Sequence, residues 1–158
     1  LQKHNLGVNT MKLTKSAAVG ILLVSGLAMA GFAQASGLPQ SPAPAGAKAY
    51  IVNLKDGDKV KSPFKVVFGL SGMGIAPAGV EKEDTGHHHL LINKSLEGPA
   101  LQSNIPADDK HVHFGKGQTE AMVQLPPGQH VLQLVLGDHN HIPHVPPIVS
   151  EKITVIVE

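Results

Sequence analysis

Residues 129–136 read Gln-His-Val-Leu-Gln-Leu-Val-Leu, and this stretch alternates cleanly between two sets of side chains. One set is valine or glutamine at positions 131, 133 and 135, and the other is leucine at positions 132, 134 and 136. Because successive side chains on a β-strand point to opposite faces, a period of two predicts a strand. The turn-forming triplet Pro126-Pro127-Gly128 comes directly before it. We therefore predict a β-strand that begins immediately after a turn.

Other runs that predict strands occur on both sides of this one. They cover residues 50–54, 64–70, 87–93, 111–114, 118–125 and 152–157. Turn chemistry such as Asp56-Gly57-Asp58 separates them, and residues 69–79 and 94–110 have the glycine and proline content of loops. No stretch has a sustained helical period. The sequence therefore predicts an all-β fold, an immunoglobulin-like β-sandwich of about seven short strands, with a small barrel as the alternative.

The beginning of the chain has a different character. Residues 1–10 carry no recognisable pattern and are interpreted as a non-native upstream extension. Residues 11–35 begin with methionine and lysines, continue with an apolar run and end in Ala33-Gln34-Ala35, which is the order of a secretory signal peptide. We expect cleavage after Ala35, with Ala28-Met29-Ala30 as a second candidate site. A transmembrane anchor is the alternative because the run nearly reaches spanning length, but its small residues favour a signal peptide.

Residues 36–47 are rich in proline, alanine and glycine and are predicted to be a mobile linker. Residues 48–158 then form the predicted histidine-rich β-sandwich domain, in a mature chain of about 120 residues, the usual size of one domain. The chain has no cysteine. An exported protein without disulfides fits the bacterial periplasm, and no membrane span is expected after signal cleavage.

The charged residues narrow the function classes. All 13 basic residues are lysines; ten lie after Ser36, against 12 acidic residues, so the mature chain has a net charge of −2 with neutral histidines. Nucleic acid as a partner is excluded because it requires a basic face. The absence of arginine also speaks against enzymes that clamp phosphate or carboxylate with a bidentate guanidinium.

Nine of the ten histidines lie between His87 and His144. Most belong to closely spaced groups, which are His87-His88-His89, His111-Val112-His113 and His139-Asn140-His141, with His144 just beyond. On a strand, residues i and i+2 share a face, so each pair presents two imidazoles side by side. Imidazole is the commonest protein ligand for borderline transition metals. Because loops gather at the ends of a sandwich, the pairs are expected to meet at one metal site.

The predicted metal ligands are His87, His89, His111, His113, His139, His141, His144, Asp138 and Met73. Asp138 is interpreted either as a ligand or as an acceptor that fixes the tautomer of an imidazole. Met73 is either a thioether ligand for copper or a side chain that fills a gap in the core. His88 aligns with the apolar positions of its strand and is the candidate core-facing member. His130 stands alone after a turn and is expected to be structural or exposed.

Four stretches together resemble an exported bacterial family. They are Gly72-Met73-Gly74 through Pro77-Ala78-Gly79, Gly86-His87-His88-His89-Leu90-Leu91-Ile92, His113-Phe114-Gly115-Lys116-Gly117-Gln118-Thr119-Glu120, and Leu132-Gln133-Leu134-Val135-Leu136-Gly137-Asp138-His139. The family is DUF4399, which is described only as a domain of unknown function, and the resemblance covers residues 50–157. It implies periplasmic export and one small domain. It implies no activity, so the expectation of a metal site depends on the residues alone.

Residues 111–115, His-Val-His-Phe-Gly, are also similar to the His-x-His strand of copper/zinc superoxide dismutases. The chain lacks that family's disulfide cysteines and has no arginine to guide superoxide. This likeness therefore does not predict dismutase activity.

The leading hypothesis is a periplasmic metal-binding protein for a copper or zinc ion, which it buffers or delivers to another periplasmic metalloprotein. A metal-dependent hydrolase or redox enzyme is the alternative, but the acidic residues stand at no recognisable catalytic spacing, so no catalytic residue is predicted. A structural or interaction domain of the envelope is the third interpretation, in which the histidines form a pH-sensitive surface.

Overall fold

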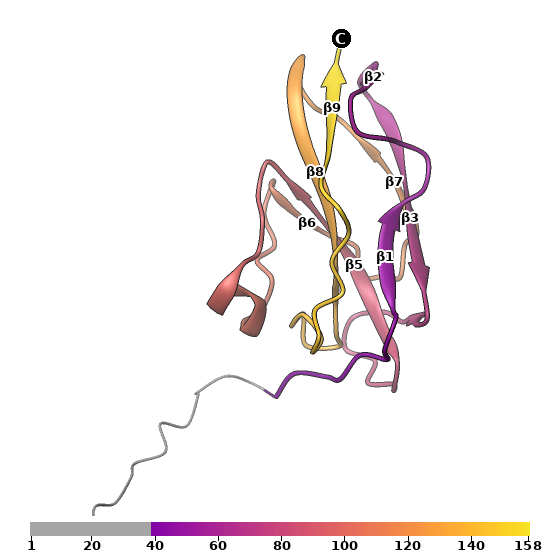
Figure 1. The fold of residues 1–158 in the computed structure, drawn as a ribbon, viewed down its shortest axis with the longest axis vertical. Coiled ribbons are helices and arrows are strands. Elements are labelled where there is room, and N and C mark those ends of the chain that lie inside the picture. The colour runs from indigo at the N-terminus through magenta and orange to yellow at the C-terminus, as the bar shows by residue number, and fades with distance from the viewer. Residues whose placement is uncertain (1–38) are drawn as a thin grey trace, which may run out of the picture. The chain divides into compact units, whose positions relative to one another are not determined.

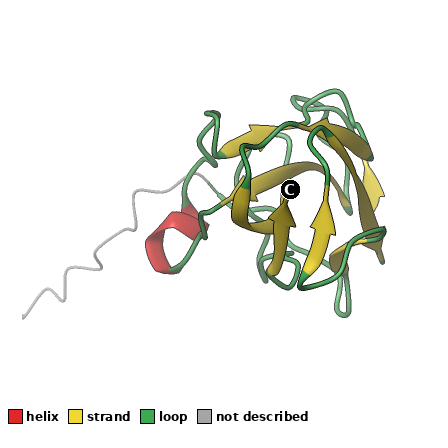
Figure 2. Ribbon diagram, turned by 90° about the horizontal axis from the view of Figure 1, so that it is seen from above, coloured by secondary structure: helices red, strands yellow, loops and turns green. Residues whose placement is uncertain are grey.

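The computed structural model describes residues 39–158, so the predicted extension and signal peptide, residues 1–10 and 11–35, lie outside the described residues. The strands are β1 (Lys48–Ile51), β2 (Asp58–Val60), β3 (Phe64–Ser71), β4 (Gly74–Ile75), β5 (Thr85–Ile92), β6 (His111–His113), β7 (Glu120–Val123), β8 (Gly128–Gly137) and β9 (Ile153–Val157). One 3₁₀ turn, η1 (Gly98–Gln102), lies outside the strands (Figures 1 and 2). No helix within residues 39–158 is long and apolar enough to cross a membrane.

The strands form two sheets (Figure 1). One has the order β1-β3-β7, and the other has the order β2-β9-β8-β5-β4, with β6 also paired to β5. The core between the sheets contains the leucines of β8 at positions 132, 134 and 136, together with Leu90 of β5 and Val66 of β3. Two sheets packed on one apolar core make a sandwich. The predicted all-β sandwich is therefore confirmed.

Strand β8 is buried along most of its length, which explains why both of its alternating sets are largely apolar. The leucine set faces the main core. Val135 of the other set packs with Leu91 of β5 and Ile105 in a second, smaller apolar cluster. Ile105 belongs to the long connection between β5 and β6, so this connection covers the outer face of the large sheet.

The structure has two more strands than the sequence predicts. β2 pairs in parallel with β9, and β4 pairs in parallel with residues 85–86 at the start of β5. Both are very short and lack an alternating pattern of their own. Their strand geometry depends on partners far away in the sequence, which a local pattern does not reveal.

Residues 40–43, in the described part of the predicted linker, are hydrogen-bonded to the domain. Ala43 N–H donates to the carbonyl of Val145, and Val145 N–H donates to the carbonyl of Ser41. Gln40 adds side-chain hydrogen bonds to the carbonyls of Pro143 and Leu101. Residues 40–43 therefore lie along the loop after β8, hydrogen-bonded to it.

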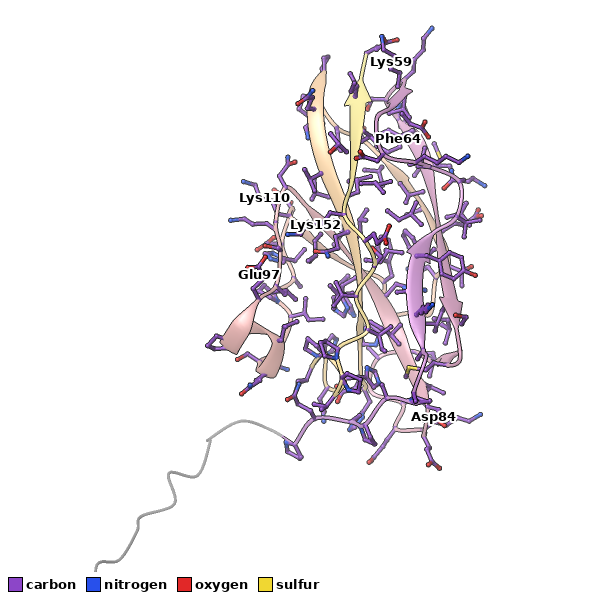
Figure 3. The ribbon with its side chains drawn as sticks, viewed as in Figure 1. Lys59, Phe64, Asp84, Glu97, Lys110 and Lys152 are labelled. Carbon is purple, nitrogen blue, oxygen red and sulfur yellow. The ribbon has the colours of Figure 1, made fainter. Side chains whose placement is uncertain are left out.

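Strand β5 holds the central position among the strands that carry histidines. One of its edges pairs with β8, and its other edge is shared, first by β4 and then by β6. Figure 3 labels Asp84, the residue before β5, at one end of the strands and Lys59 at the opposite end. The histidines of β5 therefore lie toward the Asp84 end.

Candidate metal centre

Four imidazole rings meet on the outer face of the large sheet, and we call His87, His89, His113 and His141 the histidine cluster. The ring of His87 lies 4.8 Å from His89, 5.0 Å from His113 and 4.9 Å from His141, measured between centroids. His113 lies 5.1 Å from His89 and 4.7 Å from His141. Side chains from two strands and one loop therefore converge on a common centre.

Strand geometry positions three of the four rings. His87 and His89 are two residues apart on β5 and so share a face. β6 pairs with β5 in a register that sets His113 directly opposite His89, and their rings are stacked. Directly opposed side chains on one face lie within contact distance in an antiparallel pair. The third strand-borne imidazole is therefore placed by pairing between strands that are distant in sequence.

Nitrogens of three of these rings lie close enough together to share one ion. His87, His113 and His141 each offer a ring nitrogen within 4.8 Å of those of the other two. A tetrahedral ion with bonds of about 2.0–2.1 Å needs its nitrogens about 3.4 Å apart. His87 and His89 are 0% exposed, whereas His113 and His141 are partly exposed. The latter two therefore lie on the side of the cluster that faces solvent.

Several ring nitrogens in the cluster have no hydrogen-bond partner among the described residues. Within residues 39–158, both ring nitrogens of His87 and of His89, and Nε2 of His113, are buried without a protein partner. Buried polar groups in proteins are nearly always hydrogen-bonded, because an unpaired one costs about 1–3 kcal/mol. A neutral imidazole has one nitrogen with a free lone pair, so each of these rings can offer that nitrogen to a metal cation.

The cluster favours neutral imidazoles. Burial, together with the neighbouring His141 and His113, lowers the pKa of His87 to about 4. Burial and the other cluster histidines lower the pKa of His89 to about 2. The pKa of His113 is also lowered, by burial and by His141. Because only neutral imidazole binds a metal, a lowered pKa in these three rings reduces the number of protons that binding must release.

Two glycines make room for the rings. A Cβ atom at Gly137 would lie 2.7 Å from Cε1 of His89, and a Cβ atom at Gly115 would collide with the ring of His113. At both positions, any residue other than glycine would have to displace the imidazole ring. Gly137 and Gly115 are therefore part of the site.

His141 comes from the loop after β8 and depends on Asp138. The Oδ1 atom of Asp138 accepts from the N–H groups of Asn140 (2.8 Å) and Ile142 (3.0 Å), and Oδ2 accepts from the hydroxyl of Ser41 (2.8 Å). Burial raises the pKa of Asp138, but these hydrogen bonds outweigh it and hold the pKa below its ordinary value. The carboxylate is therefore ionised, and it shapes the turn that carries His141.

The remaining predicted ligands lie outside the histidine cluster. Nδ1 of His111 is bonded to Asp108 at 2.9 Å, three residues away. His144 is buried, with Nε2 against the carbonyl of Thr85, and Nε2 of His139 meets the side chain of Asn140. Met73 packs against the main core. The structure therefore brings together four of the nine predicted ligands.

Two further histidines behave as the sequence suggests. His88 is fully buried on the core side of β5, where its ring lies 5.3 Å from that of Phe68. Burial lowers the pKa of His88 to about 4. His130 is bonded through Nδ1 to Asn93 and through Nε2 to the carbonyl of Pro126. Neither takes part in the histidine cluster.

Sequence reasoning missed Ser41, Gly115, Gly137 and the connection that contains Ile105. Ile105 N–H donates to the carbonyl of His141 at 2.7 Å, and the side chain of Asn104 donates to the carbonyl of Asn140. The sequence could have indicated the two glycines, because each stands within two residues of a predicted ligand. Ser41 had none, since it is 97 residues from the carboxylate that it contacts.

A comparison of the sequence with curated proteins found no match. A family model does match, over residues 66–158, and its description is "Domain of unknown function (DUF4399)". The matched region includes all four members of the histidine cluster and both glycines that make room for them. Since it spans more than half of the chain, the resemblance drawn from the sequence is confirmed, and the chain belongs to the DUF4399 family.

Proposed function

We propose that this protein binds a divalent transition-metal ion at the histidine cluster, in the bacterial periplasm after export, with copper as the first candidate and zinc as the second. One observation carries the proposal: His87 and His89 are fully buried, and their ring nitrogens have no protein hydrogen-bond partner within the described residues. A bound cation would satisfy one nitrogen of each ring, the one without a proton. The lowered pKa values keep the rings in the neutral form that coordinates.

The donor set supports a divalent ion. An all-imidazole site suits copper(II) and zinc, and copper(II) binds such sites more tightly than zinc in the Irving–Williams order. The thioether of Met73 packs against the core rather than with the cluster, and the chain has no cysteine. Sulfur ligands are those that select copper(I). The oxidised ion is therefore the preferred cargo.

The exposure of the cluster supports transfer of the ion. His87 and His89 form its buried side, whereas His113 and His141 are partly exposed. To reach a partner protein, an ion at the cluster would have to leave on the side of His113 and His141. We therefore favour buffering of the metal, or its delivery to another periplasmic metalloprotein, over permanent storage.

The enzyme alternative has weaker support. A hydrolytic metal site needs a base beside the metal-bound water. Asp138 is the buried carboxylate of this region, and its two oxygens already accept hydrogen bonds from Ser41 and from two backbone N–H groups. Binding without turnover is therefore the function that the geometry favours.

The test is a competition titration of the metal-free protein with copper(II) and with zinc, for the wild type, His113→Ala and His111→Ala. The two variants are matched, because His111 stands two residues earlier on β6 but is bonded to Asp108. We expect one ion per chain and an affinity loss of more than about 100-fold for His113→Ala, since loss of an outer partner alone costs about 10–100-fold. His111→Ala should retain wild-type affinity. No stoichiometric uptake, or equal losses in both variants, would contradict the proposal.

Export has its own test. The full chain, expressed in a Gram-negative host, should yield a periplasmic product whose mass corresponds to a first residue at Ser36, because the A-x-A signal ends at Ala35. Retention of the intact chain in the inner membrane would instead indicate an anchor.

A further inference from the structure

His141 differs from the other three members of the histidine cluster because no strand holds it. Its backbone φ is +64°, in the left-handed region that residues other than glycine rarely adopt. Such conformations persist only where surrounding contacts enforce them. Something outside the regular sheets must therefore hold His141 at the centre.

Asp138 supplies part of that restraint from within the loop. Its Oδ1 accepts from Asn140 N–H and Ile142 N–H, on either side of His141. The backbone N–H of His141 also donates to the carbonyl of Asp138, at 2.9 Å. The position of His141 thus depends on the orientation of a single carboxylate, which is 1% exposed.

The second oxygen of that carboxylate is held from outside the loop. Oδ2 of Asp138 accepts from the hydroxyl of Ser41 at 2.8 Å. The residues around Ser41 are docked on the same loop further along. Gln40 donates to the carbonyl of Pro143 at 2.8 Å, and a parallel bridge joins Pro42 and Val145. This N-terminal segment therefore contacts the loop both before and after His141.

We infer that residues 40–43 form a strap that completes the metal centre, with Ser41 as the residue that positions His141 through Asp138. The inference rests on the proposed function and adds that the affinity of the site depends on a segment outside the sandwich. With the strap docked, ring nitrogens of His87, His113 and His141 lie within 4.8 Å of one another. With Asp138 released, the cluster keeps its three strand-borne imidazoles, and His141 is free to turn away.

The experiment compares wild type, Ser41→Ala, Ser41→Thr and Ser62→Ala in the mature chain loaded with copper(II). The first measurement is the rate of copper loss to excess EDTA. The second is the electron paramagnetic resonance spectrum, which reports the number of nitrogen ligands. Ser62 is the matched control: its Oγ accepts a hydrogen bond at 3.0 Å from the backbone of Leu125, 63 residues away, and neither residue belongs to the histidine cluster. His141→Ala provides the reference spectrum for a site without the loop ligand.

We expect Ser41→Ala to accelerate copper loss about tenfold and to shift its spectrum toward that of His141→Ala. Ser41→Thr, which keeps the hydroxyl, should restore both properties, and Ser62→Ala should change neither. A Ser41→Ala protein with wild-type release and spectrum would overturn the strap while leaving the proposed function intact, and so would a Ser62→Ala protein that changes as much. A wild type that takes up no copper would overturn both.

Discussion

At the scale of single residues, the proposed ligand His141 has a backbone conformation that opposes stability. A residue other than glycine in the left-handed region costs about 1–2 kcal/mol, and His141 adopts φ +64°. Its ring nevertheless lies within 5 Å of those of His87 and His113. The conformation makes sense if the imidazole is needed at that position, because a glycine would serve the turn better.

This conflict gives the first prediction. His141→Gly should weaken copper(II) binding by more than about tenfold. It should leave the metal-free protein as stable as the wild type or more stable by about 0.5–1 kcal/mol, because strain relief outweighs the entropy cost of glycine. Thermal unfolding by circular dichroism and a copper competition titration measure the two effects. A metal-free variant that unfolds well below the wild type would contradict the strain argument.

His88 gives the second prediction, because it is the histidine of its triplet that faces the core. Both of its ring nitrogens are buried without a partner within the described residues, and its neighbour across the core is Phe68. His88→Leu removes an unpaired polar group, so we expect the free energy of unfolding to rise by about 1–3 kcal/mol. Copper affinity should not change, since His87 and His89 lie on the other face. Loss of copper binding in this variant would show that the triplet acts as one unit.

At the scale of elements, the ring of His89 depends on the absence of a side chain on the neighbouring strand. Gly137 ends β8, and a Cβ atom there would lie 2.7 Å from Cε1 and 3.2 Å from Nδ1 of His89. Gly74 of β4 is a useful comparison, because a Cβ atom there would make an ordinary 3.4 Å contact with Thr85. Both glycines stand on strands next to β5, but only Gly137 faces the cluster.

The third prediction concerns this pair of glycines. Gly137→Ala should destabilise the protein by about 1–3 kcal/mol, the usual cost of overpacking, and should lower copper affinity because His89 must move. Gly74→Ala should stay within about 0.5 kcal/mol of the wild type, as most substitutions without a clash do. Chemical denaturation of the metal-free proteins and copper titrations give both values. Equal stability and equal copper affinity of the two variants would rule out a need for glycine at position 137 beside the ring of His89.

At the scale of the whole molecule, the buried histidines make stability depend on pH. The folded-state pKa is about 4 for His87 and His88 and about 2 for His89, all below the ordinary value of 6.5. Between pH 6.5 and about 4, the unfolded chain therefore binds protons that the folded chain does not. Stability rises with pH wherever the unfolded state binds more protons. The unfolding free energy must then fall as the pH drops through this window.

The fourth prediction is that the melting temperature of the metal-free protein decreases steadily from pH 7 to pH 4.5. His88→Leu should show a smaller decrease, because it removes one of the three groups. Copper at saturating concentration should raise the melting temperature at pH 7, since a ligand that binds only the folded state stabilises it. Differential scanning calorimetry checks all three. A flat pH profile would mean that the histidines are not buried as the structure has them.

Local sequence is enough to predict most of the strands and one side of the candidate site. The alternation over residues 129–136 reflects the covalent geometry of an extended chain, and β8 spans Gly128–Gly137. The same geometry places His87 and His89 on one face, with His88 opposite. Such two-residue relations are local, and so they can be inferred without knowledge of any partner.

Which other histidines join that pair depends on the tertiary fold. His113 enters through the register of β6 on β5, whereas His111, on the same strand, is bonded to Asp108 instead. His141 enters through a loop that Asp138 and Ser41 hold, and Ser41 lies 97 residues from Asp138. Strand register and loop docking depend on contacts between segments far apart in the chain, and a pattern of neighbouring residues carries no information about them.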